Sequence, residues 1–223
     1  MSTEEALRRD GFAPVGLLLS PAECVAARDL YEVPGLFRSR IQMERYRFGR
    51  GEYQYFADPL PGFVQEMRQK LYGELAPVAN RWNADLGLAR EFPPGHDEFL
   101  AACRAAGQLR PTPLLLKYGA GDFNCLHQDL YGEVAFPFQV IVGLSRPGEE
   151  YEGGELVLVE SVPRAQSTAR CVLLKQGEGV VITTRYRPVR GARGFYRAAM
   201  KHGVSPVRWG ARFTLGLIFH DAQ

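Results

Sequence analysis

Residues 112–129 read TPLLLKYGAGDFNCLHQD, and they are the clearest indication of the fold class in this chain. It contains two short runs of strand-forming residues, 112–118 and 123–129, joined by a turn with two glycines. Similar runs, separated by Gly and Pro, continue toward the C-terminus over 136–144, 154–160, 170–175, 179–184, 198–204 and 212–220. Eight short strands separated by such turns predict an antiparallel sandwich or barrel.

The residues before this stretch predict mainly helices. We expect helices over 21–31, from about 61 onward and over 96–106, and one strand over 12–19. The first helix follows a capping-box pattern, Ser20 to Glu23, with proline at its first position. In the second helix, Pro77 is expected to kink or restart the chain. Helices followed by strands indicate an α+β chain whose helices buttress one sheet.

The composition is that of one globular domain: 223 residues, 46% hydrophobic and 23% charged. We expect a single domain over 1–223, with 1–110 as a helical support containing one N-terminal strand and 111–223 as the β core. No run of 18 apolar residues is present, so we expect a cytoplasmic protein with neither a signal peptide nor a membrane span. The cysteines are scattered without a CxxC pair and are expected to be buried free thiols: Cys24, Cys103, Cys125 and Cys171.

The formal net charge of +2 is distributed unevenly. Residues 179–223 carry eight Lys or Arg and one acidic residue, which leaves 19 of the 27 basic and 24 of the 25 acidic residues for 1–178. A basic C-terminal part predicts contact with an anion, either a small cosubstrate or a polyanion. A solvated basic face is the alternative.

His127 and Asp129 are the residues of greatest chemical interest. On an extended strand, residues two apart point to the same face, so this imidazole and this carboxylate should converge. One further histidine would complete a facial set of two His and one carboxylate, which leaves coordination positions open and suits non-haem Fe(II) and O2. A buried hydrogen-bonded cluster is the alternative.

His202 is the better candidate for the distant ligand. We expect a hairpin centred near Val207 to place His202 directly opposite Arg212, because cross-strand neighbours lie about 5 Å apart. Arg212 would then lie at a distance from the metal that one small dicarboxylate could span. Thr214, two residues on, would point to the same face of the strand as Arg212. His220 lies eight residues beyond Arg212, roughly 26 Å along a strand, which is too far.

The order His127-x-Asp129, then His202, then Arg212-x-Thr214 resembles the Fe(II)/2-oxoglutarate-dependent dioxygenases. The stretches LLKYGAG at 115–121 and GGEL at 153–156 are similar to their prolyl-hydroxylase-like branch. More closely, the chain from about residue 11 to residue 222 resembles a bacterial family of such oxygenases described as acting on alkylated DNA. That resemblance is carried by RFG at 47–49, GEY at 51–53, PTP at 111–113, LHQDLYG at 126–132, HGVS at 202–205 and IFHDA at 218–222.

One feature departs from the well-known alkylated-DNA demethylases. Those enzymes follow their cosubstrate Arg with further Asn, Thr and Arg residues at alternate positions. Here Arg212 is followed by FTLG at 213–216, so the second anchoring Arg is missing.

The resemblance implies a double-stranded β-helix, a jelly-roll or cupin-like core of about eight antiparallel strands buttressed by N-terminal helices. It implies Fe(II) held by His127, Asp129 and His202, with 2-oxoglutarate and O2 as cosubstrates and ascorbate as a stimulant. The implied reaction hydroxylates a C–H bond while 2-oxoglutarate is decarboxylated to succinate. The residues expected at the cosubstrate are Arg212, which would bind the distal carboxylate, Thr214, Tyr118 and Gln139; ordinary strand or core positions are the alternative for the last three.

Two segments that interleave Arg with aromatic residues, 38–56 and 185–197, bear on the substrate. Guanidinium groups for phosphates and rings for stacking are what a single-stranded or flipped-out base requires. The substrate candidates are Asn124, Arg47, Tyr53, Arg187 and Arg190. Oxidative demethylation of an alkylated nucleic acid is therefore one predicted function. Hydroxylation of a peptide, free amino acid or small metabolite is the alternative, and a non-catalytic metal-binding β-barrel module is the third. We expect no membrane partner and predict no oligomeric state.

Overall fold

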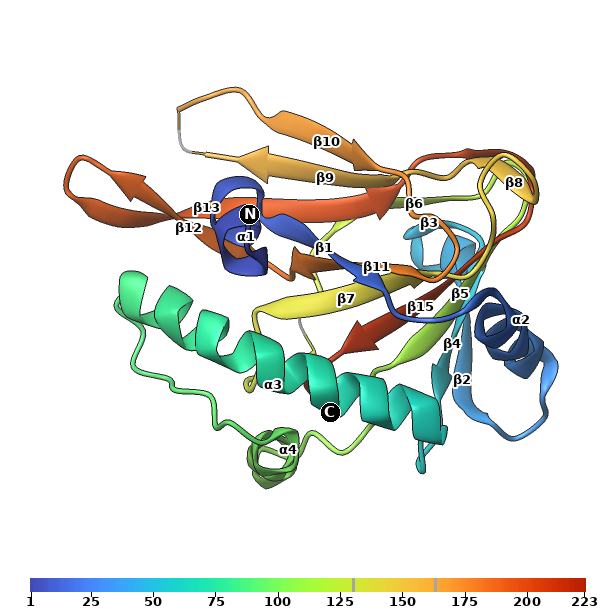
Figure 1. Ribbon diagram of the computed structural model, residues 1–223, viewed down its shortest axis with the longest axis horizontal. Helices are drawn as coiled ribbons and strands as arrows, with labels where there is room; N and C mark the ends of the chain where they lie inside the picture. The colour runs from blue at the N-terminus through green and yellow to red at the C-terminus, as the bar shows by residue number, and fades with distance from the viewer. Residues whose placement is uncertain (130, 163) are drawn as a thin grey trace.

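Two β-sheets packed face to face form the centre of the computed structural model, which describes residues 1–129, 131–162 and 164–223 (Figure 1). The strands are β1 (Phe12–Leu17), β2 (Phe37–Gln42), β3 (Gly49–Arg50), β4 (Glu52–Phe56), β5 (Leu114–Tyr118), β6 (Phe123–His127), β7 (Phe138–Gly143), β8 (Tyr151–Gly153), β9 (Leu156–Ser161), β10 (Thr168–Val172), β11 (Glu178–Thr183), β12 (Tyr186–Gly191), β13 (Gly194–Val204), β14 (Val207–Gly210) and β15 (Arg212–Ile218). The helices are α1 (Thr3–Asp10), α2 (Pro21–Asp29), α3 (Gly62–Asp85) and α4 (His96–Ala105), with short 3-10 turns η1 (Leu30–Glu32) and η2 (Met43–Tyr46).

The larger sheet has seven strands in the order β1-β11-β7-β15-β5-β4-β2. The smaller sheet has the order β10-β9-β13-β6-β3, and β12 pairs with β13 as a hairpin that projects from it (Figure 1). Strands β14 and β8 pair with each other, and every pairing between these strands is antiparallel. The chain crosses repeatedly between the facing sheets, for example from β5 to β6 to β7 and from β10 to β11 to β12, as in a jelly-roll.

Side chains alternate between the two faces of the larger sheet, and this alternation creates the interior of the jelly-roll. On β7, Phe138, Val140 and Val142 belong to the main hydrophobic core, on the side of the helices. Gln139 and Ile141, between them, line a cavity on the opposite side. The strand therefore contributes to stability with one face and to the candidate site with the other.

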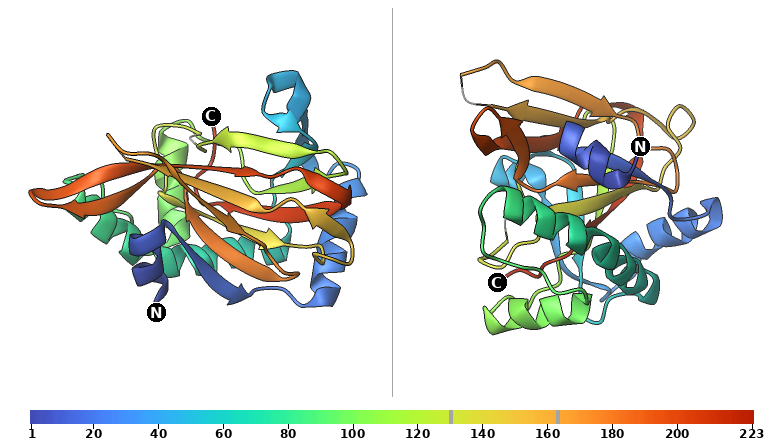
Figure 2. Two further views of the ribbon diagram at one scale, coloured as in Figure 1. Left: turned by 90° about the horizontal axis from the view of Figure 1, so that it is seen from above. Right: turned by 60° about the vertical axis from the view of Figure 1, so that its left-hand side comes forward.

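Helix α3 covers the outer face of the larger sheet, with α4 beside it (Figures 1 and 2). The restart predicted at Pro77 does not occur, because α3 runs as one helix from Gly62 to Asp85. Leu75 and Ala79, on the two sides of the proline, are both buried in the same core cluster. This packing holds the helix together across the backbone hydrogen bond that proline cannot make.

Most strands of the β-rich region were predicted, but the expected count of about eight is too low. The eight predicted runs correspond to β5, β6, β7, β9, β10, β11, β13 and β15, while β8, β12 and β14 lie between them. The prediction that 1–110 contains one strand is wrong, since β1, β2, β3 and β4 all lie in the sheets. The 38–56 segment hides β2 and β4 because its arginines and tyrosines do not show the usual apolar alternation.

Two smaller expectations also need correction. Helix α1 was not predicted, although Ser2 and Glu5 form a capping box at its start. Of the cysteines, Cys24 and Cys103 are buried as expected, whereas Cys125 and Cys171 are exposed. None of the helices in the described part of the chain is long and apolar enough to cross a membrane.

A buried arginine connects α3 to the end of the larger sheet. Arg68 is 1% exposed. Its Nε donates to the carbonyl of Ile218 over 2.8 Å, and its Nη2 donates to Asp221 Oδ1 over 2.7 Å. The helix and the segment that follows β15 are thus joined by a charged pair with little access to water.

We expect Arg68→Met to lower the free energy of unfolding by about 3–5 kcal/mol, because it leaves the buried Asp221 carboxylate without a cation. Urea denaturation followed by circular dichroism measures this change. Arg81→Met on the same helix is the matched control, since Arg81 pairs with Glu4 at the surface, where a pair contributes less than about 1 kcal/mol. Equal effects of the two substitutions would contradict the role given to burial.

Candidate functional site

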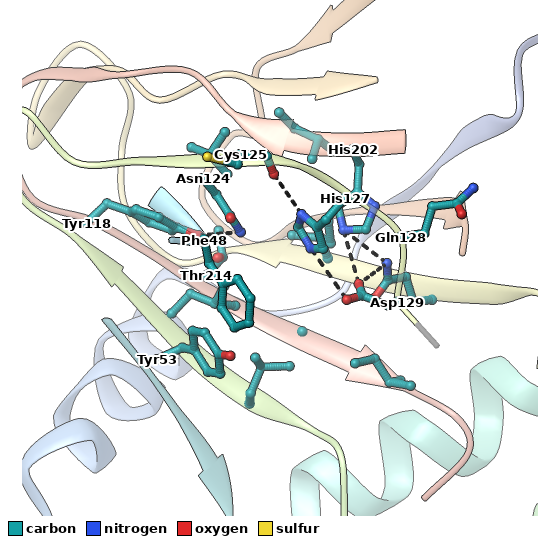
Figure 3. A pocket seen from close by; sticks show the side chains of 18 of the residues that line it. Phe48, Tyr53, Tyr118, Asn124, Cys125, His127, Gln128, Asp129, His202 and Thr214 are labelled. Atoms are coloured by element: carbon teal, nitrogen blue, oxygen red, sulfur yellow. Dashed lines mark hydrogen bonds and ion pairs between the residues drawn. The ribbon is translucent and has the colours of Figure 1, made fainter. Parts of the chain in front are cut away.

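A cavity of about 360 Å³ lies between the two sheets, and most of the predicted site residues line it (Figure 3). These are His127, Asp129, His202, Arg212, Thr214, Tyr118, Gln139, Asn124, Arg47 and Tyr53. Further walls come from Phe48, Cys125, Gln128 and Tyr131. The tertiary structure therefore brings together residues that are more than 160 positions apart in the chain.

Two histidines and one aspartate converge at this cavity (Figure 3). His127 ends β6 and is the register partner of His202 on β13, and their ring centroids are 4.3 Å apart. Asp129 places one carboxylate oxygen 3.4 Å from His127 Nε2 and the other 3.1 Å from His202 Nε2. One ligand atom from each residue lies within 4.8 Å of the others. Asp129 lies two residues beyond the end of β6, so the expectation that one strand carries both His127 and Asp129 is not met.

Hydrogen bonds orient these three side chains. His127 Nδ1 lies 2.8 Å from the carbonyl of Cys125, to which it can donate, leaving the lone pair on Nε2 free. The carboxylate of Asp129 accepts from the Tyr131 hydroxyl at one oxygen and from the Gln139 amide at the other, both over 2.8 Å. Tyr131 was not singled out from the sequence, although it belongs to the LHQDLYG motif. Leu130 of that motif lies outside the described residues.

The charges of the group follow from these contacts. Burial opposes ionisation of Asp129, but the adjacent imidazoles lower the pKa of its carboxyl group well below the usual range. Burial likewise opposes protonation of His127, yet hydrogen bonding and attraction to Asp129 raise the pKa of its imidazole. Two imidazole nitrogens and one carboxylate oxygen make a donor set that suits a divalent transition metal.

Arg212 supplies an uncompensated positive charge to the same cavity. It is 2% exposed, and it forms no ion pair with any residue that the structure describes. Its guanidinium carbon lies 5.5 Å from the centre of the Tyr118 ring, on the neighbouring strand β5. A Cβ at Gly154 would come within 2.8 Å of Arg212 Cδ, and the backbone there is left-handed with φ 63°, so this position of the GGEL motif favours glycine. Burying a cation without a partner is costly, and an anion bound in this cavity would offset that cost.

The hairpin expected to place His202 opposite Arg212 does not form. His202 lies on β13 in the smaller sheet, whereas Arg212 lies on β15 in the larger sheet, and β14 with its partner β8 lies between them in the chain. The two residues nevertheless reach the same cavity because the sheets face each other. Thr214, two residues beyond Arg212 on β15, lines the cavity as the alternation of the strand predicts.

Tyr118 and Asn124 form a second polar group in the cavity. The Asn124 amide lies 3.5 Å from the Tyr118 hydroxyl. Burial raises the pKa of Tyr118 to about 12, so its hydroxyl stays protonated and can donate. Gln139, which was predicted near the cosubstrate, lines the same cavity, donates to Asp129 and lies 3.3 Å from His202 Nε2.

An aromatic lip, Tyr46 and Phe48, stands at the edge of the cavity. The rings stack at 5.5 Å and 21°, yet they are 55% and 47% exposed. Arg47, between them, has a left-handed backbone with φ 59° and lines the cavity together with Phe48. The carbonyl of Phe48 accepts from the Cys125 amide over 2.8 Å, so the lip is attached to β6 close to His127.

Two predicted substrate residues lie elsewhere. Arg187 does not line this cavity and is engaged by Glu160, with its Nε donating over 2.6 Å. Arg190 is exposed on the projecting β12–β13 hairpin, also away from the cavity. The predicted contact of these two arginines with the substrate therefore does not come from the lining of this cavity and stays a prediction, since a sequence pattern of alternating Arg does not reveal which of them pair with acids. His220 is also outside the metal cluster, since it is buried and its Nδ1 accepts from the backbone amide of Phe136.

Comparisons with solved structures agree with this architecture. A prolyl-4-hydroxylase from Pseudomonas putida is similar with a TM-score of 0.58 at 13% identity, over 99% of this chain and 97% of that one. A prolyl hydroxylase from Trichoplax adhaerens, solved with a hypoxia-inducible-factor peptide fragment, has a TM-score of 0.59 at 16% identity, over 98% and 87%. At these identities the likeness shows the fold, the jelly-roll core of 2-oxoglutarate oxygenases.

Sequence comparisons identify the family. An uncharacterized protein of Mycobacterium tuberculosis is 51% identical over 167 residues, which is 75% of this chain and 72% of that protein. Residues 51–222 match the profile of a family described as "Oxygenase, catalysing oxidative methylation of damaged DNA". The chain therefore belongs to this family of oxygenases.

Proposed function

We propose that the protein is an Fe(II)- and 2-oxoglutarate-dependent dioxygenase that hydroxylates a C–H bond and releases succinate and CO2. The observation that carries the proposal is that the His127, Asp129 and His202 cluster and the unpaired Arg212 face one cavity between the sheets. A metal dication can bind to the imidazole nitrogens and the carboxylate of the cluster. One carboxylate of a dicarboxylate can pair with the Arg212 guanidinium. A β-barrel module that only binds metal would not need the second feature.

The residues have distinct roles in this proposal. His127, Asp129 and His202 hold Fe(II), which supplies the redox chemistry with O2 when bound. Tyr131 and Gln139 hold the Asp129 carboxylate in place, which makes them positioning residues. Their other contribution is to satisfy the carboxylate oxygens without introducing a competing cation.

Arg212 binds the distal carboxylate of 2-oxoglutarate with charge-assisted hydrogen bonds. Thr214, on the same face of β15, and the Tyr118 hydroxyl line the same cavity and are neutral donors for that carboxylate. Apolar residues fill the rest of this end, including Leu116, Ile141 and Val204. They exclude water, which strengthens the attraction between the guanidinium and its anion.

For the substrate we propose a methylated base in a single-stranded or flipped-out nucleic acid, from which hydroxylation of the N-methyl group would release formaldehyde. The family description names damaged DNA. The aromatic lip supports this choice, because two exposed stacked rings beside Arg47 offer a planar base a stacking surface and its phosphate a cation. The missing second arginine after Arg212 distinguishes this site from the well-known alkylated-DNA demethylases. A peptide is the alternative, and one similar structure holds a peptide fragment.

His202→Ala should abolish succinate release in the presence of Fe(II), ascorbate and 2-oxoglutarate, because it removes a ligand. Tyr131→Phe removes only the hydroxyl that donates to Asp129, so we expect Mn(II) binding about 10–100-fold weaker, without loss of the fold. Calorimetric titration with Mn(II) measures the metal affinity of both variants, and succinate release is assayed separately. Tyr55→Phe is the matched control, since that hydroxyl contacts Tyr131 and not the carboxylate. Wild-type metal affinity in His202→Ala would refute the ligand assignment.

Arg212→Met should have two opposite effects. It should raise the melting temperature of the protein without 2-oxoglutarate, because it removes a buried unpaired charge. It should also raise the KM for 2-oxoglutarate at least about tenfold, since hydrogen bonds to charged groups contribute about 1.5–3 kcal/mol. Arg212→Lys keeps the charge without the planar guanidinium, so its KM for 2-oxoglutarate should lie between those of the wild type and Arg212→Met. An unchanged KM in Arg212→Met would exclude this residue as the carboxylate anchor.

Phe48→Ala should raise the KM for a methylated single-stranded oligonucleotide about 5–100-fold, the effect of losing one stacking contact. Formaldehyde release measures turnover, and 2-oxoglutarate consumption without substrate should stay unchanged. Trp209→Ala is the control, because Trp209 is similarly exposed, at 44% against 47%, but lies outside the cavity. Turnover of a peptide or metabolite, with none of any methylated oligonucleotide, would favour the alternative substrate.

A further inference from the structure

A second cavity, of about 450 Å³, is lined by residues from the C-terminal end of α3 and from the base of the β12–β13 hairpin. It is lined by Trp82, Asn83, Leu86, Leu88, Ala89, Arg90, Phe92, Glu133, Ala135, Phe136, Pro137, Thr184, Arg185, Tyr186 and Arg197. None of these residues lines the first cavity. Its size is that of a pocket for a small molecule.

The inner wall of this second cavity is aromatic and rigid. Trp82 is 1% exposed and packs edge-on against Phe138 of β7, with ring centroids 4.7 Å apart. Phe92 and Phe136 are also buried and meet at 4.9 Å. These rings are already almost fully buried, so they form a fixed apolar back to the cavity, and a planar ligand would contact only the ring atoms that border it.

The rim of the cavity is positively charged. Arg90, Arg185 and Arg197 line it, and none of them forms an ion pair with a residue that the structure describes, whereas Glu133 is the one acid among the lining residues. The guanidinium carbons of Arg185 and Arg197 lie 4.5 and 5.7 Å from the centre of the Tyr186 ring. Stacking on one tyrosine keeps two free guanidinium groups close to each other at the entrance.

The second cavity adjoins the candidate site through one segment. Gln128 and Tyr131 line the first cavity, and Glu133 and Pro137 line the second, so the segment that follows β6 separates the two. The Gln128 amide donates over 2.9 Å to the carbonyl of Arg185, at the base of the hairpin. A ligand in the second cavity would therefore lie on the opposite side of the segment that carries Asp129 from the first cavity.

We propose that this cavity binds one nucleotide unit, with its base against the aromatic wall and its phosphate at Arg185 and Arg197. An aromatic wall with a guanidinium rim matches a planar ring joined to an anion, and it matches neither an apolar ligand nor a bare anion. The nucleotide can come from a strand whose neighbouring base enters the first cavity, or it can be a free nucleotide. The strand source rests on the nucleic-acid substrate proposed above, and the free-nucleotide source does not.

The test compares two double variants on one hairpin. Arg185→Ala/Arg197→Ala removes two rim cations, and Arg190→Ala/Arg193→Ala removes the same charge from positions on the hairpin that do not line the cavity. The probes are a fluorescein-labelled thymidine hexanucleotide, followed by anisotropy, and thymidine 5′-monophosphate, followed by calorimetry. We expect the first pair to weaken binding at least about tenfold and the second pair less than about twofold.

Trp82 provides a local readout. The chain has two tryptophans, so in a Trp209→Phe variant the emission comes from Trp82 alone, and saturable quenching reports occupation of this cavity. If Arg185→Ala/Arg197→Ala weakens binding of the hexanucleotide alone, the nucleotide comes from a strand. If it weakens binding of the monophosphate alone, the ligand is a free nucleotide. Equal weakening by both double variants, or no binding of either probe to the wild type, would overturn the proposal. Succinate release without substrate is measured in parallel and tests the proposed reaction separately.

Discussion

The buried carboxylate of Asp129 is the group on which the site depends. An isolated carboxylate in this position would be very costly, and its charge is maintained by two imidazoles on one side and by the hydroxyl of Tyr131 and the amide of Gln139 on the other. These partners come from β6, from the segment after it, from β7 and from β13. The cluster therefore forms only when the two sheets face each other in the correct register.

The cavity holds a carboxylate that is paired with imidazoles and a guanidinium that has no ion-pair partner among the described residues. Asp129 and its imidazoles offer ligands for a cation, while Arg212 lacks an anion among the described residues. A chelating dicarboxylate, bound to a metal at one end, satisfies both requirements. Gly154 shows how closely the fold approaches this arginine, since a Cβ there would meet its side chain at 2.8 Å. The site is thus built around missing partners, which explains why a cofactor and a cosubstrate are needed to complete it.

The arginines of 185–197 show how one sequence pattern divides into different environments. Arg187 is held by Glu160 and contributes to the structure. Arg185 and Arg197 stack on Tyr186 at the second cavity. Arg190 is exposed on the projecting hairpin. The arginines of the basic C-terminal part therefore occupy different environments, which its net charge alone does not distinguish.

The local features of this protein can be predicted from its amino-acid sequence. Alternation and turn residues located eight of the strands, the capping box located α2, and the residue types at His127, Asp129, His202 and Arg212 indicated a metal and a dicarboxylate. These signals are local because they depend on backbone periodicity and on side-chain chemistry. The three-dimensional structure was needed to show that His202 and Arg212 lie on facing sheets and that Tyr131 donates to Asp129. It was also needed to show which of the described arginines form no ion pair. Those features depend on contacts between residues far apart in the chain, and such contacts leave no periodic signal in the sequence.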